Sequence, residues 1–435
     1  MKTHEPQLLA GFARMDITPE PGILLMGYPD PDRKAESVRD PLSADALVLQ
    51  QGKTTAVLIS LSICILDDAG VEAIRRGIEQ QTGIPADSIV ICTAQTHSAP
   101  CTMTCWGWCD RDESYVDLLV GRSIRAAVEA SQNLQQAQVG IGTTESDVGV
   151  NRRAIMADHS VGLGYNHWGI YDPEMTVLCL QTADGPLATL IHYGAHPTVL
   201  SSDSRAISRD WPGVMIDRVE DLTGAPAFFV NGAVGDIAPR SNVLGAVGDG
   251  EVALLEVGTR AAMDAMRAIR TIKDFRNVAL GITTGVYQLP YRPLPDEAEA
   301  SRHLAAAGPH RDEYGRGMCE FKYWQAVIEA QQAAPVSGKN YLQVILRLGP
   351  VAIVPFPGEP FAEIVLRHRD LSPAQYTLCA STSCGSNGYF VTRESLNRGG
   401  YEVWVARAMG AHILAENIDD VLVEENMRLL AQAYA

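Results

Sequence analysis

Short apolar runs of strand length alternate with helical patterns through the first third of the chain. The runs Ala44–Leu49 and Thr55–Leu61 are joined by a turn-like Gln-Gly-Lys and predict a β-hairpin. Asp68–Gln81 carries apolar residues at a helical period and ends at Gly83, so it predicts a helix. A buried-type strand, Ser88–Cys92, follows at once. Strands and helices in alternation predict an α/β fold.

The same alternation continues to the end of the chain. Helices are expected over Tyr115–Ser131, Trp211–Leu222 and Glu251–Ile269, through most of residues 294–334 with a break near Gly308-Pro309, and at the C-terminus. Strands are expected over Gly11–Pro19, Ala137–Gly142, Met175–Leu180, Ala188–Ile191, Pro226–Val230, Arg276–Leu289, Tyr341–Leu346, Val351–Val354 and Gln375–Ser381. The polar stretch after Arg153, with His159 and Trp168, is expected to be a long loop. Because no repeat or Pro- or Ser-rich linker interrupts the pattern, we expect one compact unit over residues 1–435.

Composition narrows the classes of partner and compartment. The 435 residues are 46% hydrophobic and 20% charged, which is ordinary for a globular protein, and the net charge is −17. This charge argues against a nucleic-acid or anionic-membrane surface, and no apolar stretch has the length of a transmembrane helix. The polar Met1–Gln7 is unlike a signal peptide, and the nine cysteines are odd in number and scattered, so a cytoplasmic protein with reduced thiols is expected. Cys101, Cys105 and Cys109 match no zinc spacing and are expected to pack beside the site.

Metal-binding side chains recur where expected strands end. His192 and His196 follow Ala188–Ile191, His97 follows Ser88–Cys92, and Glu359 follows Val351–Val354. In an open α/β sheet, ligands bind at the carboxyl ends of strands, and imidazole is the commonest metal ligand in proteins. The plain alternatives are structural or surface histidines, and a glutamate that only complements the dipole of a following helix.

Several short segments, taken together and in order, resemble the N-terminal catalytic domain of the neutral ceramidase family. They are Gly11–Thr18 with Met26-Gly-Tyr28, Thr96-His-Ser98, His196-Pro-Thr198 with Ile207-Ser-Arg-Asp210, Asn231-Gly-Ala-Val-Gly-Asp236, Pro357-Gly-Glu359 and Asn387-Gly-Tyr-Phe-Val-Thr-Arg393. The resemblance spans nearly the whole chain. It implies an α/β fold of mixed β-sheets layered with helices.

The resemblance also implies a site. In that family a zinc ion is held by two histidines, a glutamate and a tyrosine, and the matching residues are His97, His196, Glu359 and Tyr389. Substrate-binding positions of the family match Arg152 and Tyr401, and Asn231 is assigned to the substrate with them.

Two departures from the family pattern bear on mechanism. The family nucleophile is a serine in Gly-Asp-Val-Ser-Pro, whereas this chain has Gly235-Asp-Ile-Ala-Pro239, so Ala238 excludes a covalent serine route at that position. Longer ceramidases carry a C-terminal immunoglobulin-like domain and a secretion signal, and neither is expected here. The expected lack of this domain and of the secretion signal argues against ceramide as the substrate.

These observations predict a zinc-dependent hydrolase of the amidase type. A zinc-activated water would cleave an amide (C–N) bond of a small soluble molecule, with Asp236, Asp210 or His192 orienting the water or accepting its proton. The sequence leaves open which of the three acts as the base. It also leaves open whether the protein forms a homo-oligomer. The alternatives are a zinc esterase or lactonase, a zinc lyase or isomerase acting on a carbonyl, and a non-catalytic ligand-binding homologue.

Overall fold

The structure is a computed structural model and describes residues 6–241, 250–308 and 316–435. Its largest element is an eight-stranded sheet in the order β12 (Ala227–Asn231), β10 (Gly185–Tyr193), β9 (Glu174–Thr182), β6 (Gln135–Glu145), β1 (Leu9–Asp16), β3 (Ser43–Gln51), β4 (Thr54–Leu61) and β5 (Ile89–Thr93). Neighbours within this sheet are antiparallel except at its two edges, where β10 pairs with β12 and β4 with β5 in parallel. Each parallel pair is joined by a crossover helix, as parallel strands require.

A second sheet of four strands faces the first. Its order is β14 (Leu280–Pro290), β15 (Gly338–Leu348), β16 (Val351–Pro355) and β18 (Tyr376–Ala380), and β16 and β18 are parallel. Three small sheets complete the topology: β13 (Ile237–Pro239) with β7 (Gly149–Ile155) and β8 (Val161–Asn166), β2 (Ser37–Val38) with β11 (Ala206–Ile207), and β17 (Glu359–Pro360) with β19 (Tyr389–Phe390).

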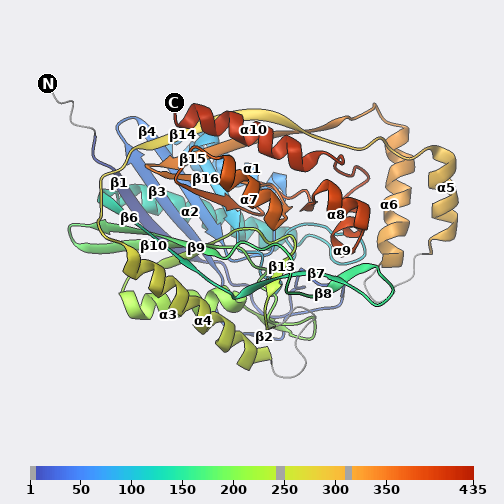
Figure 1. The fold of residues 1–435 in the computed structure, drawn as a ribbon, viewed down its shortest axis with the longest axis horizontal. Coiled ribbons are helices and arrows are strands. Elements are labelled where there is room, and N and C mark those ends of the chain that lie inside the picture. Colours follow the sequence, from blue (N-terminus) through green and yellow to red (C-terminus); the bar gives the residue numbers. More distant parts are fainter. Residues whose placement is uncertain (1–5, 242–249, 309–315) are drawn as a thin grey trace.

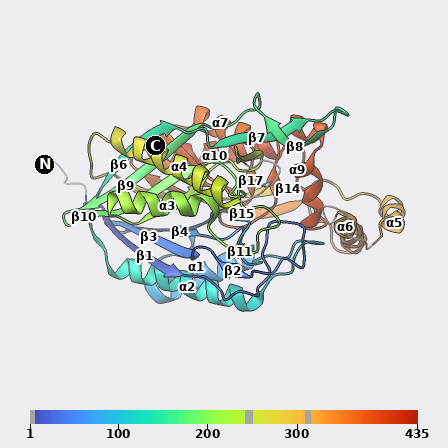
Figure 2. The same cartoon turned by 90° about the horizontal axis from the view of Figure 1, so that it is seen from below.

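Helices cover the outer faces of the two large sheets (Figures 1 and 2). The helices are α1 (Asp68–Thr82), α2 (Glu113–Gln132), α3 (Asp210–Thr223), α4 (Gly250–Thr271), α5 (Glu297–Ala306), α6 (Arg316–Gln331), α7 (Ala362–Leu371), α8 (Arg393–Arg398), α9 (Tyr401–Trp404) and α10 (Ile418–Ala433), with short 3₁₀ turns η1 (Ala86–Ser88) and η2 (Val405–Ala408). Contacts place α2 on β1 and β3, α4 on β6 and β9, and α7 and α10 on the four-stranded sheet. The expected fold class, mixed β-sheets layered with helices, is confirmed.

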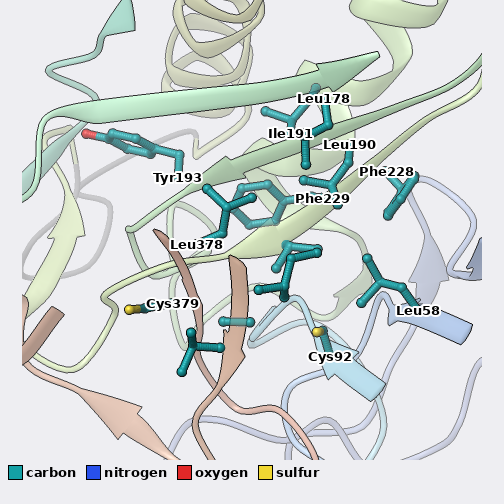
Figure 3. Close-up of a cluster of buried hydrophobic side chains, with 14 of the residues drawn as sticks. Leu58, Cys92, Leu178, Leu190, Ile191, Tyr193, Phe228, Phe229, Leu378 and Cys379 are labelled. Atoms are coloured by element: carbon teal, nitrogen blue, oxygen red, sulfur yellow. The ribbon is translucent and has the colours of Figure 1, made fainter. Parts of the chain in front are cut away.

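The main core joins the two large sheets and the helices α3, α4, α7 and α10, and part of it, with side chains from β4, β5, β9, β10, β12 and β18, is drawn in Figure 3. Strand β12 is apolar at every position except the last, because it is buried on both faces. Phe228 stacks on Phe12 at 5.8 Å between ring centroids, while Phe229 turns to the other side and meets Trp211 at 5.2 Å. A strand buried on both faces reads as a continuous apolar run, as the sequence pattern indicated.

The two edges of the eight-stranded sheet approach one another. Strand β12 contacts both β4 and β5, and the Ser60 hydroxyl of β4 donates to the Phe229 carbonyl of β12 at 2.6 Å. As a result, the carboxyl ends of β5 and β10 lie close to the ends of β16 and β18 in the opposing sheet, where the Ser381 amide donates to the Asn231 carbonyl at 2.9 Å. All four predicted metal ligands follow these strand ends.

Most predicted elements are present, and one prediction was wrong. The expected hairpin is β3–β4, paired in register from Ala44↔Leu61 to Gln51↔Thr54. The polar stretch expected to be a loop is instead the hairpin β7–β8, with His159 at its turn in a left-handed conformation and Trp168 exposed beyond it. Glycines and polar side chains along β8 hide the two-residue period that identifies strands.

The expected helical region 294–334 contains α5 and α6, which project at one end of the protein in both views (Figures 1 and 2), and α6 packs there against η2. The break expected near Gly308-Pro309 falls largely on residues outside the described part of the chain. No helix of residues 6–241, 250–308 and 316–435 is long and apolar enough to cross a membrane.

Candidate metal centre

His196 and Glu359 form the centre of the site. The His196 Nε2 and the Glu359 Oε2 lie 3.1 Å apart, and both side chains are buried. The Nδ1 of His196 lies 3.0 Å from the Ile237 carbonyl, and donating its proton there leaves Nε2 with a lone pair. Neither Nε2 nor the facing Oε2 has a hydrogen-bond partner in the described structure. Two buried groups that can each offer an electron pair, in contact with one another and without hydrogen-bond partners among the described residues, fit a shared cation.

His97 lies beside this pair. Its ring centroid is 5.5 Å from that of His196, and its buried Nδ1 has no hydrogen-bond partner among the described residues. Burial, together with the neighbouring His196, holds the pKa of His97 well below its usual range, so the imidazole is neutral and able to ligate. Gly27 of the Met-Gly-Tyr segment packs against this ring at φ +104°, where a Cβ would lie 2.3 Å from the His97 Cγ. That position therefore requires glycine.

Arg152 connects Tyr389 to the same centre. Its Nη2 donates to the Tyr389 hydroxyl at 3.1 Å and to the Gly235 carbonyl at 2.8 Å, and its Nη1 lies 3.4 Å from His196 Nδ1. Burial alone would lower the pKa of Arg152, but Tyr389, Glu402 and Glu359 outweigh it and raise the pKa. The guanidinium is therefore a fixed positive charge that orients the phenol.

Glu402 holds that arginine in place. Its two carboxylate oxygens accept from Arg152 Nε at 3.0 Å and from Arg153 Nη1 at 2.6 Å, and the side chain is almost completely buried. Tyr401, the preceding residue, lies under the guanidinium with its ring centroid 5.8 Å from the Arg152 Cζ. The sequence analysis missed Glu402, and its only signal was a carboxylate next to a predicted substrate-binding tyrosine.

A small pocket opens onto these groups. It has a volume of about 50 Å³ and is lined by His97, Glu359, Tyr389 and Tyr401 on its polar side. The opposite walls are apolar and come from the loop carrying Trp108 and from η2. The pocket is therefore shared by Glu359 with two further predicted metal ligands, His97 and Tyr389, and with the predicted substrate residue Tyr401. His196 lies behind Glu359 and contacts it.

Gln95 is a second residue that the sequence analysis missed. It lines the same pocket, its buried Oε1 has no hydrogen-bond partner among the described residues, and its backbone has φ +70°. A left-handed conformation at a residue other than glycine, asparagine or aspartate is uncommon and clusters at functional sites. The amide oxygen is a further neutral donor beside His97. A polar residue within the run Thr93-Ala-Gln-Thr-His97 was the available signal.

Within the described ranges, no group of three or more His, Cys, Asp and Glu side chains is already arranged to hold a metal ion, and this includes the predicted His97, His196 and Glu359. The convergence consists instead of the His196–Glu359 pair, with His97, Gln95 and the Tyr389 phenol around the adjoining pocket.

The three residues predicted to act as a base lie outside the pocket lining and are engaged elsewhere. Asp236 accepts from the Ala362 amide at the start of α7 and from Asn151, each through one oxygen, and burial raises its pKa to about 7. Asp210 accepts from three backbone amides around its own loop, and burial raises its pKa to about 6. The His192 Nε2 lies 3.1 Å from the Cys379 carbonyl. Their assignment as the base stays a prediction.

Asn231 links three strand ends beneath the site. Its Nδ2 donates to the Ala94 carbonyl at 2.9 Å and to the Ala195 carbonyl at 3.2 Å, and its Oδ1 accepts from the Ala195 amide at 3.3 Å. Ala94 precedes the Gln95–His97 segment and Ala195 precedes His196, so these bonds set the positions of the histidine loops. The predicted contact of Asn231 with substrate is untested.

Ala238 lies on β13, and its methyl group packs against Val150 of β7 in a small separate apolar cluster. The side chain at this position is buried. The three neighbouring cysteines, Cys101, Cys105 and Cys109, are all buried in the apolar cluster behind the pocket, as free thiols. Cys105 also lines the pocket itself.

Fold and site together define an α/β protein whose pocket gathers polar groups at the carboxyl ends of strands from two facing sheets, the placement typical of enzyme active sites. Residues 8–259 match the model of the neutral/alkaline non-lysosomal ceramidase family, N-terminal part. The chain belongs to this family, as its sequence motifs predicted. Family membership implies a hydrolase of the amidase type.

Solved structures agree with this assignment at the level of the fold. A neutral ceramidase from Pseudomonas aeruginosa matches with a TM-score of 0.75 at 16% sequence identity, over 98% of this chain and 75% of that chain. A ceramidase complexed with C2 matches with the same TM-score and coverage at 15% identity. No curated protein matches the sequence.

Proposed function

We propose that this protein is a zinc-dependent hydrolase that cleaves the amide bond of a small soluble molecule. The observation that carries the proposal is the contact of His196 Nε2 with Glu359 Oε2, two buried acceptors without hydrogen-bond partners at the wall of a pocket. His196 and Glu359 would hold the ion together with His97 and Tyr389. Neutral imidazole, carboxylate and phenol oxygen are suitable ligands for Zn²⁺.

A bound Zn²⁺ would supply Lewis acidity, which polarises a substrate carbonyl and makes water more acidic. The protein's own groups then orient the substrate. Arg152 fixes the direction of the Tyr389 hydroxyl, and Tyr401, which lines the same pocket, can donate its own hydroxyl to an oxyanion. The apolar walls of the pocket exclude water from the acyl side.

The amide would be attacked by water, because the side chain at position 238 is a methyl group packed on Val150. The small volume of the pocket supports a small acyl group over a long lipid chain. A cavity of about 150 Å³ accommodates benzene, and the volume here is about 50 Å³. The proposed partner is therefore a small-molecule amide, with esters and lactones as related acyl substrates.

The test is elemental analysis of chelator-washed, zinc-reloaded protein combined with a hydrolysis screen over N-acyl amines, N-acyl amino acids, lactones and esters. One zinc per chain, with amide hydrolysis lost on chelation and restored by zinc, is the expected result. His196→Ala is expected to hold almost no zinc. The matched control, His368→Ala, removes a buried histidine that contacts the Ile364 and Leu422 carbonyls and should keep full zinc. Full zinc in His196→Ala would show that the site is misplaced.

A non-catalytic binding protein is the second candidate, and the apolar Ala238–Val150 contact favours it because the family nucleophile position carries no reactive group. Stoichiometric zinc and saturable binding of an N-acyl compound, without turnover across the whole panel, would support this candidate and refute the hydrolase.

A further inference from the structure

A second, larger chamber adjoins the pocket of the metal centre. Its volume is about 420 Å³, within the range of small-molecule sites. Tyr389, Ala406 and Met409 line both cavities, so the two cavities adjoin at these residues. The inner pocket is mainly apolar, whereas the chamber carries cationic and polar side chains from the segments near Arg111, Arg292 and Lys339.

The carboxylates in the chamber wall are already paired. Asp67 accepts from Arg111 Nη1 at 2.7 Å, and Asp68 forms an ion pair with Lys339. Glu402 is shared by Arg152 and Arg153, as described above. These acidic groups therefore cannot neutralise an additional cation without giving up an existing partner.

Arg292 is that additional cation. Its Nε donates to the Leu414 carbonyl at 3.0 Å, which fixes the direction of the side chain, and it makes no ion pair with any residue of the described ranges. Beside it in the wall, His412 stacks on Tyr291 at 5.0 Å between centroids, and its buried Nδ1 has no hydrogen-bond partner in the described part of the chain. The Nη groups of this half-buried guanidinium have no partner among the described residues, and a guanidinium matches the planar geometry of a carboxylate.

We propose that this chamber binds the carboxylate of the substrate's amine half, so that the substrates are N-acyl amino acids with a short acyl group. This inference rests on the proposed amide hydrolysis. The acyl group would occupy the inner pocket, the amide would lie at Tyr389, and the carboxylate would reach Arg292 in the chamber wall. In the reaction the C–N bond breaks and water supplies its hydroxyl to the acyl carbon and a proton to the nitrogen. The products are a short carboxylic acid and an amino acid.

The test compares N-acetylalanine with N-acetylalaninamide, which have the same shape and differ in the charge read by Arg292. The wild-type protein should prefer N-acetylalanine, and Arg292→Gln should lower the ratio of the two kcat/KM values by about tenfold to a hundredfold, the range of a hydrogen-bonded charge pair. Arg292→Lys, which keeps the charge but loses the fork, should restore part of the ratio. Arg276→Gln, an exposed arginine of the Asp274 ion pair, should leave the ratio unchanged. A ratio unaffected by Arg292→Gln would overturn the inference.

Calorimetric titration of zinc-loaded protein with N-acetylalanine separates the two proposals. If wild type hydrolyses neither compound but binds N-acetylalanine about tenfold or more tightly than Arg292→Gln does, the carboxylate subsite stands and the hydrolase proposal fails. If amides are hydrolysed, but binding and turnover are the same for N-acetylalanine and N-acetylalaninamide and are unchanged in Arg292→Gln, the hydrolase stands and the subsite is refuted. If no binding depends on Arg292 and no turnover occurs, both are refuted.

Discussion

Replacing Asn231 tests whether this residue supports the site or binds substrate. Its side chain makes three buried hydrogen bonds that join the Ala94 and Ala195 segments to the end of β12. Asn231→Ala removes all three and leaves one amide and two carbonyl groups without that partner. Because these segments carry His97 and His196, a structural role predicts that stability and zinc binding fall together.

The size of the effect follows from the bonds. A buried hydrogen bond contributes about 1 kcal/mol net, so the loss of three predicts a decrease of about 3 kcal/mol in the free energy of unfolding, and more where the stranded groups stay dry. Asn231→Asp is nearly isosteric but places carboxylate oxygens against the carbonyls of Ala94 and Ala195, where Nδ2 now donates. Asn231→Asp should therefore lower the free energy of unfolding by more than Asn231→Ala does.

Urea unfolding followed by tryptophan fluorescence measures the change, with zinc content measured on the same samples. Asn340→Ala is the matched control, because Asn340 is exposed on β15 and should shift the free energy of unfolding by less than about 0.5 kcal/mol. If Asn231→Ala keeps wild-type stability and zinc content but raises KM alone, the residue binds substrate and the structural argument is wrong.

Three further changes test other parts of the site. Saturating zinc at about 100 times its Kd should stabilise wild type by about 2.7 kcal/mol but leave His196→Ala unaffected in a thermal scan; equal shifts would contradict the ligand assignment. Ala238→Ser should not raise amide hydrolysis and should cost about 1–3 kcal/mol, because its hydroxyl enters the apolar contact with Val150; a large gain in activity would show a latent serine route. Burial raises the pKa of Asp236 to about 7, above its unfolded value of about 4, so the folded state binds the extra proton and stability falls as pH rises from about 4 to about 7, by up to about 1.4 kcal/mol per pH unit. Asp236→Asn should flatten this part of the stability profile, and an unchanged slope would refute the shift.

The sequence could predict the elements that have a strong period and a clear end. Helix α1 begins with Asp67 accepting from the Gly70 amide and ends at Gly83 in a left-handed conformation, both local signals. The hairpin β7–β8 lacked such a signal, because Gly162 and Gly164 alternate with side chains of mixed polarity and its partner β13 is distant in the chain. Strand pairing of that kind depends on tertiary contacts that no local pattern contains.

For the site, sequence motifs named candidate residues but could not tell which of their side chains would meet. His196 and Glu359 are in contact, whereas Asp236, Asp210 and His192 are engaged with backbone or amide groups of their surroundings. Those partners lie up to 187 residues away along the chain, so spacing could not reveal them. Gln95 and Glu402 could not be identified from the sequence for the same reason, because their place at the site depends on burial among residues that are distant in the chain.

The order of the proposed ligands along the chain, with two histidines early and Glu359 and Tyr389 late, has a consequence for biosynthesis. A ribosome that has made the first 350 residues has produced the complete eight-stranded sheet and both imidazoles, but not yet the carboxylate or the phenol. Such a nascent chain can offer the ion only weak, partial coordination. Capture of zinc would then coincide with docking of β16 and β18, and a polypeptide truncated before Glu359 should emerge metal-free and more easily degraded than the finished protein.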